Sequence, residues 1–579
     1  MSSLLPSRPA LRHASLAALA AGALAVSGCG DDGKDPTTTA AAPTTGAPVQ
    51  AALADDVPAT AVAFAQGDIR PEGDTKAGVL EVSKALGIAD PGKALIDELD
   101  LDDLAPDGKR FQADVLPHLG DHVGGFLIER PAKGRGDGPT ASGALVAEVR
   151  DANALRAALG PELRKGTKLD VDGQEVYRER GDDKDPLTVW IGDRTLSIGK
   201  EDAVRQAIAA GAGDDLAGAA RYRGAIGQVR ATDPLAVAWV DLRHAQVLDG
   251  LLEELSGSVD AEVLNRAGIG KRHGGRGDHG DRGALGLGAA MPNIDATLAL
   301  AAEATPGRIA IQSGGTQPEG AGGAAGGGAD AVAALPSGSW LGAGLGDLRS
   351  GLLGGLAGGG VEGKAKGEDP KETVRGLGEL LGVRLPDQLL EDLDGIRSVT
   401  LGARGDSLLS LGGAVVVQAK DAGAADRFLT ALTDVLREKG LRPQPRDIAG
   451  AQKGVVGQFS GLPLQVAAAV SGDKVAVGLG PDSVAGALQP KGRLGDDPIY
   501  REAQEALGGT KPQLLLNARR IADLLGSLPM GRFEGVLQVV RRLQLLTAGS
   551  QSTGATTWRG SVVLKYGPPA SGSSGASSR

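Results

Sequence analysis

The residue whose surroundings specify a chemistry most clearly is Cys29, the only cysteine among 579 residues. A thiol is a far better nucleophile than a hydroxyl, so a group that must be alkylated is best supplied by cysteine. The residues before it, Val26 to Gly28, are aliphatic or small, which suits the narrow active site of a peptidase. Upstream lie Arg8, Arg12 and an apolar run from Leu16 to Val26, which is shorter than the roughly 20 residues that span a bilayer.

A basic start, a short apolar middle and a small-residue site form the pattern of a secretory signal. Residues 26–29 resemble the bacterial lipobox, which implies a diacylglycerol thioether on Cys29 with palmitate or similar acyl chains. We therefore predict a lipoprotein signal peptide over 1–28, a disordered tether over 29–56 and an extracytoplasmic protein anchored to the cell membrane. The alternative is an ordinary secretory signal with a chance cysteine.

A second candidate group is the pair His118 and His122, four residues apart with Asp121 between them. On a helix this spacing can place two imidazoles on one metal ion. Pro117 and Gly120 oppose a helix here, and the matching region of the second half has no histidine. We therefore predict no metal site.

Other motifs that could carry chemistry are weak. His273 and His279 lie in a glycine-rich segment of mixed charge, which favours a solvated loop. Gly342, Gly344 and Gly346 are spaced like part of a dinucleotide fingerprint, but the helix and acidic residue that this site requires do not follow. No catalytic residue is assigned, the cofactor-binding residues are unknown, and we predict a protein without cofactor or enzymatic activity.

Composition excludes several partners. The formal net charge of -11 argues against nucleic-acid binding, and aromatics at 2% of the chain argue against stacking platforms for bases or sugars. The bias toward Ala, Gly, Asp and Arg is typical of a GC-rich bacterial genome and indicates an actinobacterium. The partners that remain are the membrane, through the lipid on Cys29, and an unknown protein or lipophilic ligand.

The chain contains an internal duplication. Four pairs of segments recur in the same order, beginning at Val57 and Leu335, Gly143 and Gly413, Gly192 and Gly472, and Trp239 and Leu515. The offsets are 335 − 57 = 278, 413 − 143 = 270, 472 − 192 = 280 and 515 − 239 = 276. Nearly constant offsets predict two homologous units in tandem.

Local patterns give the elements of each unit. Residues 144–149 form a Val-rich apolar run that predicts a strand, and Asp151 is placed to cap the helix that follows. Gly192 to Arg194 lies between two alternating runs, as expected for a tight hairpin. Asp202 and Asp482 are expected to cap the next helix in each copy. The predicted fold class is α+β, two tandem homologous units, each a largely antiparallel sheet with helices packed on one face.

The predicted boundaries follow from the repeat and from glycine content. The first α+β repeat is expected over 57–312 and the second over 335–568. Between them, residues 313–334 are predicted to be a Gly/Ala-rich linker, since they offer little apolar surface to bury. Residues 569–579 are predicted to be a disordered tail.

Residues 57–63, 68–70 and 116–121 resemble the opening and a Leu-Pro-x-Leu-Gly segment of the actinobacterial "domain of unknown function 3352" family. The resemblance would extend from Val57 to about Tyr566. It implies an extracytoplasmic lipoprotein or membrane-anchored protein of uncharacterised activity, and it carries over no functional residue.

Three functions remain open. The first is a non-catalytic module that binds a partner or organises the cell envelope. The second is a carrier of a lipid or lipophilic small molecule, which predicts an apolar cavity of several hundred Å³. The third is an uncharacterised envelope enzyme, which predicts a cleft with clustered titratable groups. A filled core with an exposed apolar patch would favour the first.

Overall fold

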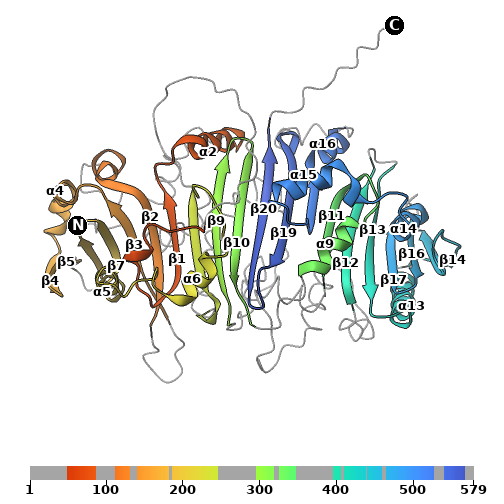
Figure 1. The fold of residues 1–579 in the computed structure, drawn as a ribbon, viewed down its shortest axis with the longest axis horizontal. Helices are drawn as coiled ribbons and strands as arrows, with labels where there is room; N and C mark the ends of the chain where they lie inside the picture. The colour runs from red at the N-terminus through yellow and green to blue at the C-terminus, as the bar shows by residue number, and fades with distance from the viewer. Residues whose placement is uncertain are drawn as a thin grey trace, which may run out of the picture. The chain divides into compact units, whose positions relative to one another are not determined.

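The fold is mixed α/β and is dominated by a large antiparallel sheet that carries helices (Figure 1). A computed structural model describes residues 48–86, 111–130, 140–180, 186–244, 295–318, 325–346, 396–405, 410–438, 440–458, 465–526 and 540–567. The predicted signal peptide and C-terminal tail lie outside these ranges. Within them, no helix combines the length and hydropathy that crossing a bilayer requires.

The chain divides into two compact units, Ala47–Ala304 and Thr305–Arg579. The strands of the first unit are β1 (Ala61–Asp68), β2 (Leu119–Arg130), β3 (Thr140–Val149), β4 (Thr167–Val171), β5 (Gln174–Arg178), β6 (Leu187–Ile191), β7 (Thr195–Lys200), β8 (Ala236–Asp241) and β9 (Thr297–Thr305). Its helices are η1 (Ala54–Asp56), α2 (Gly73–Leu86), η3 (Phe111–Val115), η4 (Leu116–His118), α4 (Ala152–Leu163), α5 (Glu201–Ala210), α6 (Ala220–Ile226) and η5 (Leu242–His244). The strands pair antiparallel in the order β9-β8-β1-β2-β3-β7-β6-β5-β4.

The strands of the second unit are β10 (Arg308–Thr316), β11 (Ser339–Leu345), β12 (Ile396–Arg404), β13 (Gly412–Ala419), β14 (Gln444–Pro445), β15 (Lys453–Gln458), β16 (Gln465–Ser471), β17 (Lys474–Leu479), β18 (Leu514–Asn517), β19 (Leu543–Ser552) and β20 (Thr557–Tyr566). Its helices are α9 (Ala325–Ala333), α13 (Ala422–Glu438), α14 (Pro481–Leu488), η8 (Leu494–Asp496), α15 (Pro498–Ala506) and α16 (Ala518–Gly526). The strands pair antiparallel in the order β10-β20-β19-β18-β11-β12-β13-β17-β16-β15-β14.

Several local predictions are confirmed. Asp151 accepts a hydrogen bond from the Ala154 N–H at 2.9 Å, and Asp421 caps α13 in the same way through Ala424 at 2.8 Å. Residues 192–194 turn between β6 and β7, and positions 472–473 make the matching turn between β16 and β17. Gly472 has φ +61°, a conformation that favours glycine.

The predicted caps at Asp202 and Asp482 are wrong. Both residues lie inside the first turn of their helices, two positions after the N-cap residue. The N-cap residues are Lys200 in α5 and Gly480 in α14. Asp202 instead accepts hydrogen bonds from Arg130 at 2.6 Å and Ser142 at 2.7 Å. Burial opposes its ionisation, but these hydrogen bonds lower the pKa of Asp202. The residue therefore ties α5 to β2 and β3.

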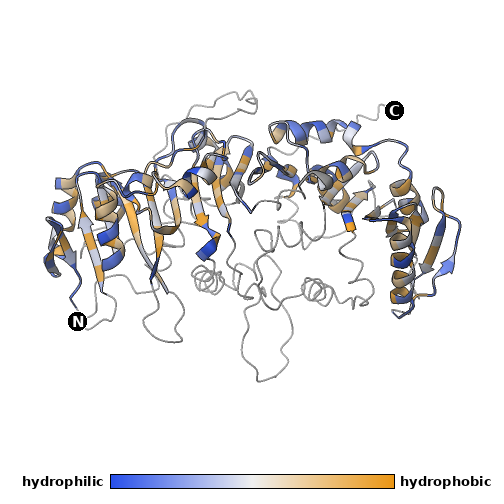
Figure 2. Cartoon of the chain, turned by 60° about the horizontal axis from the view of Figure 1, so that its bottom comes forward, coloured by the Kyte–Doolittle hydropathy of each residue, from blue (hydrophilic) through white to orange (hydrophobic). Residues whose placement is uncertain are grey.

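Helices pack on both faces of the sheet, not on one. In β13 the side chain of Val417 packs beneath α13, whereas its neighbour Val416 packs with the residues beneath α14. Successive side chains of a strand point to opposite faces, so Val416 and Val417 are buried by helices on opposite faces of the sheet. Figure 2 shows hydrophilic and hydrophobic residues interchanging along these helices and strands.

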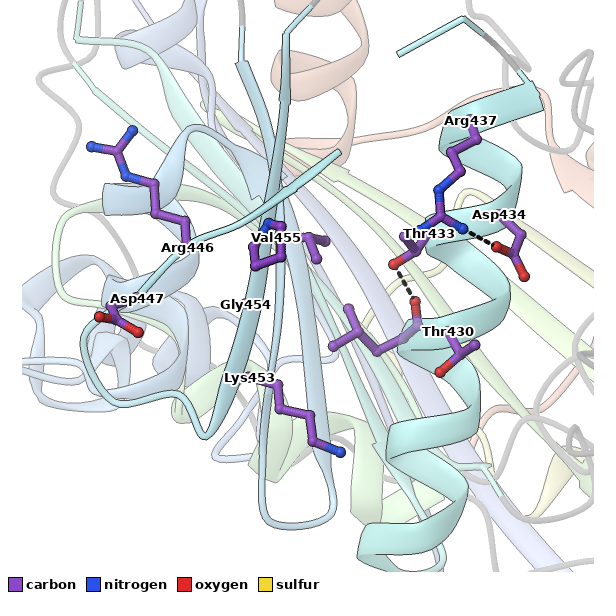
Figure 3. Close-up of a pocket in the computed structure, with 11 residues that line it drawn as sticks. Thr430, Thr433, Asp434, Arg437, Arg446, Asp447, Lys453, Gly454 and Val455 are labelled. Atoms are coloured by element: carbon purple, nitrogen blue, oxygen red, sulfur yellow. Dashed lines mark hydrogen bonds and ion pairs between the residues drawn. The ribbon is translucent and has the colours of Figure 1, made fainter. Parts of the chain in front are cut away.

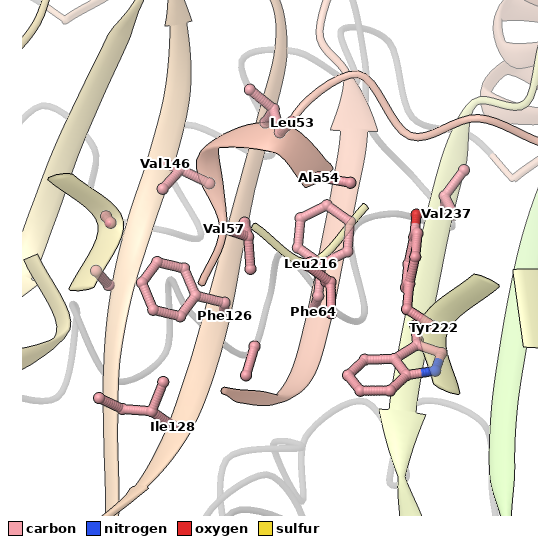
Figure 4. Packing of buried hydrophobic residues seen from close by; sticks show 14 of the residues in the cluster. Leu53, Ala54, Val57, Phe64, Phe126, Ile128, Val146, Leu216, Tyr222 and Val237 are labelled. Carbon is pink, nitrogen blue, oxygen red and sulfur yellow. The ribbon is translucent and has the colours of Figure 1, made fainter. Parts of the chain in front are cut away.

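The core of the first unit is filled. Phe64 and Val57 are fully buried, and Phe126 is 2% exposed. Tyr222 from α6 packs edge-on against Phe64, with ring centroids 6.4 Å apart (Figure 4). Leu53, in the stretch predicted to be a tether, is also part of this cluster.

The C-terminal end of the predicted tether is therefore ordered, and that prediction is corrected. Val49 and Leu53 are 5% and 2% exposed, and the Leu53 N–H donates to Gln66 at 2.9 Å. Pro48 bridges to Arg230. Apolar side chains at the end of the tether complete the core, which composition alone did not indicate.

The predicted linker, residues 313–334, is likewise corrected where it is described. Its first residues complete β10, and Ala325–Ala333 forms α9. Gly328 of α9 allows the helix to pack closely on Gly344 of β11. A Cβ on Gly344 would lie 2.2 Å from the carbonyl oxygen of Gly328. Val332 of the same helix is fully buried. The glycines at 342, 344 and 346 thus seat a helix and do not form a nucleotide loop.

Candidate functional site

Only some of the candidate residues singled out in the sequence lie in the described part of the chain. Cys29, His273 and His279 lie outside the described residues. His118 ends η4, and His122 lies in β2, so the two are not on one helix. Among the described residues, no group of three or more His, Cys, Asp or Glu side chains is placed to hold a metal ion.

His122 belongs to a polar cluster that the pairing of three strands creates. Its Nδ1 lies 3.1 Å from Oε2 of Glu148 in β3, which also accepts from the Asp121 N–H at 3.1 Å. Gly120 makes room for this carboxylate, since a Cβ there would lie 2.4 Å from the Glu148 side chain. Asp68 of β1 is directly opposite His122 in the register.

Two carboxylates of this cluster have shifted pKa values, in opposite directions. Burial opposes ionisation of Glu148, but hydrogen bonds from His122 and the Asp121 N–H outweigh it and lower the pKa of Glu148. Burial raises the pKa of Asp68, although the Arg70 N–H donates to it at 2.7 Å. The spacing of the histidines draws attention to His122, but nothing in the sequence points to Glu148, because the contact between them depends on the β2–β3 register.

The corresponding position of the second unit is neutral. There Ser398 of β12 lies 3.5 Å from Gln418 of β13, in place of the ionisable pair. The cluster in the first unit thus joins strands by charge-assisted hydrogen bonds. It contains no nucleophile activated by a base, and we interpret it as structural.

We expect Glu148→Gln to destabilise the protein at neutral pH by no more than about 1 kcal/mol, because the His122–Glu148 pair is partly exposed. A carboxylate whose pKa is lowered by folding stabilises the folded state above its unfolded pKa. The destabilisation should therefore be present above about pH 4.5, the ordinary value for Glu, and fade as the pH falls through the lower folded value. Denaturant unfolding at a series of pH values measures it.

The control for this prediction is Glu505→Gln, at an exposed position in α15 of the second unit. It should leave the dependence of unfolding on pH as in the wild type. A Glu148→Gln protein whose stability deficit grows below pH 4.5 would contradict the assignment.

A groove lies in the second unit between α13 and the strands β14 and β15 (Figure 3). Its volume is about 550 Å³. The floor includes Leu429 and Val455, and the helix wall carries the hydroxyls of Thr430 and Thr433, which donate to backbone carbonyls four residues back. The size is in the range of ligand sites, which run from about 300 to 1,000 Å³.

The groove is bordered by charges that are largely satisfied within the protein. Arg437 pairs with Asp434 on α13, and Lys453 of β15 reaches Asp426 of the helix at 2.5 Å. These ion pairs are exposed to solvent, and a lipophilic ligand in the groove would have to remove water from them, which is unfavourable. The groove therefore has the volume that a carrier needs but not the lining.

The most unusual surface is one face of the sheet in the second unit. Six large apolar side chains of the described residues are at least 39% exposed, and five of them lie on this face. Directly paired residues form a continuous row across it from β10 to β17: Ile311, Val562, Ala548, Leu514, Ala343, Leu401, Val415 and Val477. Leu345 and Leu479 follow two residues after members of this row and share its face. We call the part of the face from β10 to β12 the open face.

The opposite side of the same strands is covered. Ala310, Val563, Thr547 and Leu515, each next in sequence to a member of the row, are fully buried. In the first unit, none of the directly paired residues in the row that contains Ala65 is among the highly exposed large apolar side chains; the row consists of Leu300, Ala238, Ala65, Gly125, Leu145 and Ile198. The open face is thus specific to the second unit.

The comparisons with known proteins give no indication of function. No protein-family model, no curated protein and no solved structure matches the chain. The resemblance to the "domain of unknown function 3352" family stays a prediction, and the proposals below rest on the described contacts.

Proposed function

We propose that this protein is a non-catalytic binding module, held at the outer side of the cell membrane by a lipid on Cys29. The open face is the observation that carries the proposal. The core of the first unit is filled, yet four large apolar side chains of the open face, Ile311, Val562, Leu345 and Leu401, remain about 40% exposed together. A contiguous apolar surface of this kind is typical of an interaction site.

We also propose that the two units are homologous repeats. The strand order is the same in both: β9-β8-β1-β2-β3-β7-β6-β5-β4 in one and β19-β18-β11-β12-β13-β17-β16-β15-β14 in the other. Isolated bridges join Pro58 to Asp215 and Pro336 to Arg493, and both offsets are equal, 336 − 58 = 278 and 493 − 215 = 278. Duplication explains why one copy could keep a structural sheet face while the other acquired a binding face.

The carrier function receives less support. The groove beside α13 is large enough for a small ligand but is bordered by ion pairs, and the open face is a surface and not an enclosed cavity. An enzyme would require a reactive group that a base activates, whereas the hydroxyls of Thr430 and Thr433 in this lining donate to backbone carbonyls of their own helix. Both alternatives remain predictions of lower rank.

The proposal predicts that polar substitutions on the open face do not destabilise the fold. The double variant Leu345→Gln with Leu401→Gln should change the free energy of unfolding by less than about 0.5 kcal/mol, as for surface positions. It should also reduce binding of a hydrophobic dye to the purified protein. Thermal or denaturant unfolding and dye fluorescence measure the two effects.

The matched control is Leu80→Gln in α2, because Leu80 is 43% exposed but lies outside the open face. It should leave dye binding close to the wild-type value. A loss of several kcal/mol in the double variant would mean that other residues of this chain bury the face, and the proposed function would then lose its basis.

A further inference from the structure

We propose that two copies of this chain pair through strand β4 of the first unit, antiparallel and centred on Leu169. The inference does not depend on the open face and goes beyond the function proposed above. It follows from an unpaired strand edge, from a charge pattern that complements itself, and from the way in which the second unit protects its corresponding edge.

β4 (Thr167–Val171) is the outermost strand of the first unit (Figure 1). Among the described residues it pairs with β5 on one side and with no strand on the other. Asp172 and Gly173, with φ values of 53° and 79°, join the two strands in a two-residue turn. The residues that flank such a turn bond to each other, and bonding alternates along the strand. The N–H and C=O groups of Lys168 and Asp170 therefore point away from β5.

The connection that leaves β5 beside this edge is held on the inner side of the strand. Residues 181–185 lie outside the described ranges, but the positions on either side of them are described. The Glu179 N–H donates to the Leu187 carbonyl oxygen at 2.8 Å, and the Leu187 N–H donates to the Glu179 side chain at 3.4 Å. Both ends of the connection are thus fixed between β5 and β6, away from the outer edge of β4.

The second unit protects its corresponding edge. Its outermost strand, β14, consists of Gln444 and Pro445, and the Arg446 N–H donates to the Gly454 carbonyl oxygen of β15 at 2.9 Å. Because bonding alternates, the backbone of Pro445 points outward, and proline has no N–H to offer to a further strand. A very short edge strand with a proline is a common protection against edge pairing. β4 has five residues and no proline, so it lacks this protection.

The charges of β4 complement a second copy of the same strand. In an antiparallel pair centred on Leu169, Lys168 of each copy lies opposite Asp170 of the other. These are the residues whose backbone groups point outward, so the register that joins opposite charges also allows the backbone hydrogen bonds to form. A pair centred on Lys168 or on Asp170 would place like charges opposite each other, which is unfavourable.

The side chains on both faces of β4 can accept this neighbour. Lys168 contacts Glu175 of β5, but its side chain is 64% exposed and has three donors, so it can also bind Asp170 of the partner copy. On the other face Leu169 is partly buried against the core of the first unit. In the centred pair it meets its counterpart at the closer cross-strand spacing, about 4.5 Å between Cα atoms. Pairing would therefore bury the exposed part of Leu169.

The interface is small, and its size determines the strength that we expect. Five residues span about 17 Å of strand, and the area is below the 800 Å² or so per partner that stable complexes bury. Backbone hydrogen bonds at an edge supply binding that apolar area alone would not. We therefore expect weak pairing that requires a high local concentration, as for copies anchored in one membrane, and no stable dimer in dilute solution.

The test is disulfide trapping of the full-length protein in membranes of the cells that produce it. Leu169→Cys places a thiol on the symmetry axis, and its Cα spacing of about 4.5 Å suits a disulfide. The matched control is Thr167→Cys, on the same face of β4, whose two copies would be about 14 Å apart along the strand. We expect mild oxidation to give at least tenfold more covalent dimer from Leu169→Cys than from Thr167→Cys.

Charge reversal tests the register. In the Leu169→Cys protein, Lys168→Asp alone or Asp170→Lys alone places like charges opposite each other and should reduce the dimer about tenfold. The two variants produced together should restore the disulfide as a heterodimer, because a lysine then faces an aspartate at both charged pairs. Restoration also shows that each variant chain still folds, since both carry the same substitutions as before.

Three results would overturn the inference: no dimer from Leu169→Cys, as much dimer from Thr167→Cys, or charge reversals that leave the dimer unchanged. A disulfide from Leu169→Cys to a different protein, in place of the dimer, would also overturn it and would assign the edge to a foreign strand. The open-face variant Leu345→Gln with Leu401→Gln should leave the trapped dimer unchanged, so the two proposals succeed or fail separately.

Discussion

The variant Phe64→Ala should lower the free energy of unfolding of the first unit by about 3–5 kcal/mol, the usual cost of deleting a buried phenylalanine. Phe64 is fully buried, and its ring meets Tyr222, which in turn packs edge-on against Trp239 at 5.8 Å. Truncation removes one end of this aromatic series, takes away the ring that Tyr222 packs against, and leaves a cavity that the sheet cannot readily collapse. Against total stabilities of about 5–15 kcal/mol, the unit should become marginal. Denaturant unfolding followed by tryptophan fluorescence and circular dichroism measures the loss.

The control for this prediction is Leu80→Ala in the same unit, where the side chain is 43% exposed. It should cost less than about 1 kcal/mol, because little apolar area returns to water. If Phe64→Ala cost no more than Leu80→Ala, the aromatic cluster would not be the centre of the core.

Features set by neighbouring residues were predictable from the sequence. The cap at Asp151 is made with a backbone N–H three residues away, and the turn at Gly192 to Arg194 joins adjacent strands. Such contacts depend on the side chain and on a few dihedral angles, so local pattern is sufficient. The antiparallel arrangement was likewise predictable, because tight turns force successive strands to run in opposite directions.

The glycine-rich segment 313–334 was wrongly predicted to be a linker, because composition does not show which part of the chain packs against a glycine. Gly328 and Gly344 are 16 residues apart, and each is glycine because the backbone of the other approaches to contact distance. In isolation, the same residues are typical of a flexible linker. The distinction arises only when α9 packs on β11.

The open face could not be predicted for a related reason. Leu514 and Ala343 are opposite each other across β18 and β11, although 171 residues separate them, 514 − 343 = 171. Sequence alternation shows that a strand has two faces, but the register decides which side chains join into one surface. The Glu148–His122 contact is a smaller example, since it follows from the β2–β3 pairing and not from the spacing of histidines.

The second large effect concerns the membrane. We expect Cys29→Ala to transfer essentially all of the protein from the membrane fraction to the soluble fraction, because alanine cannot form the thioether. Each acyl CH₂ buried in the bilayer contributes about 0.8 kcal/mol, so two or three chains on Cys29 would hold the protein almost irreversibly. Fractionation of cells followed by immunodetection measures the distribution.

The matched control is Ser27→Ala, which keeps a small residue before the cysteine and should leave the protein with the membranes. A mass increase on the wild-type N-terminal peptide, absent from Cys29→Ala, would identify the lipid directly. If the Cys29→Ala protein still sedimented with membranes as the wild type does, the lipobox would be a chance cysteine after an ordinary signal. The open face would then be the first surface to examine for the remaining membrane attachment, because its exposed leucines could contact a lipid or a membrane protein.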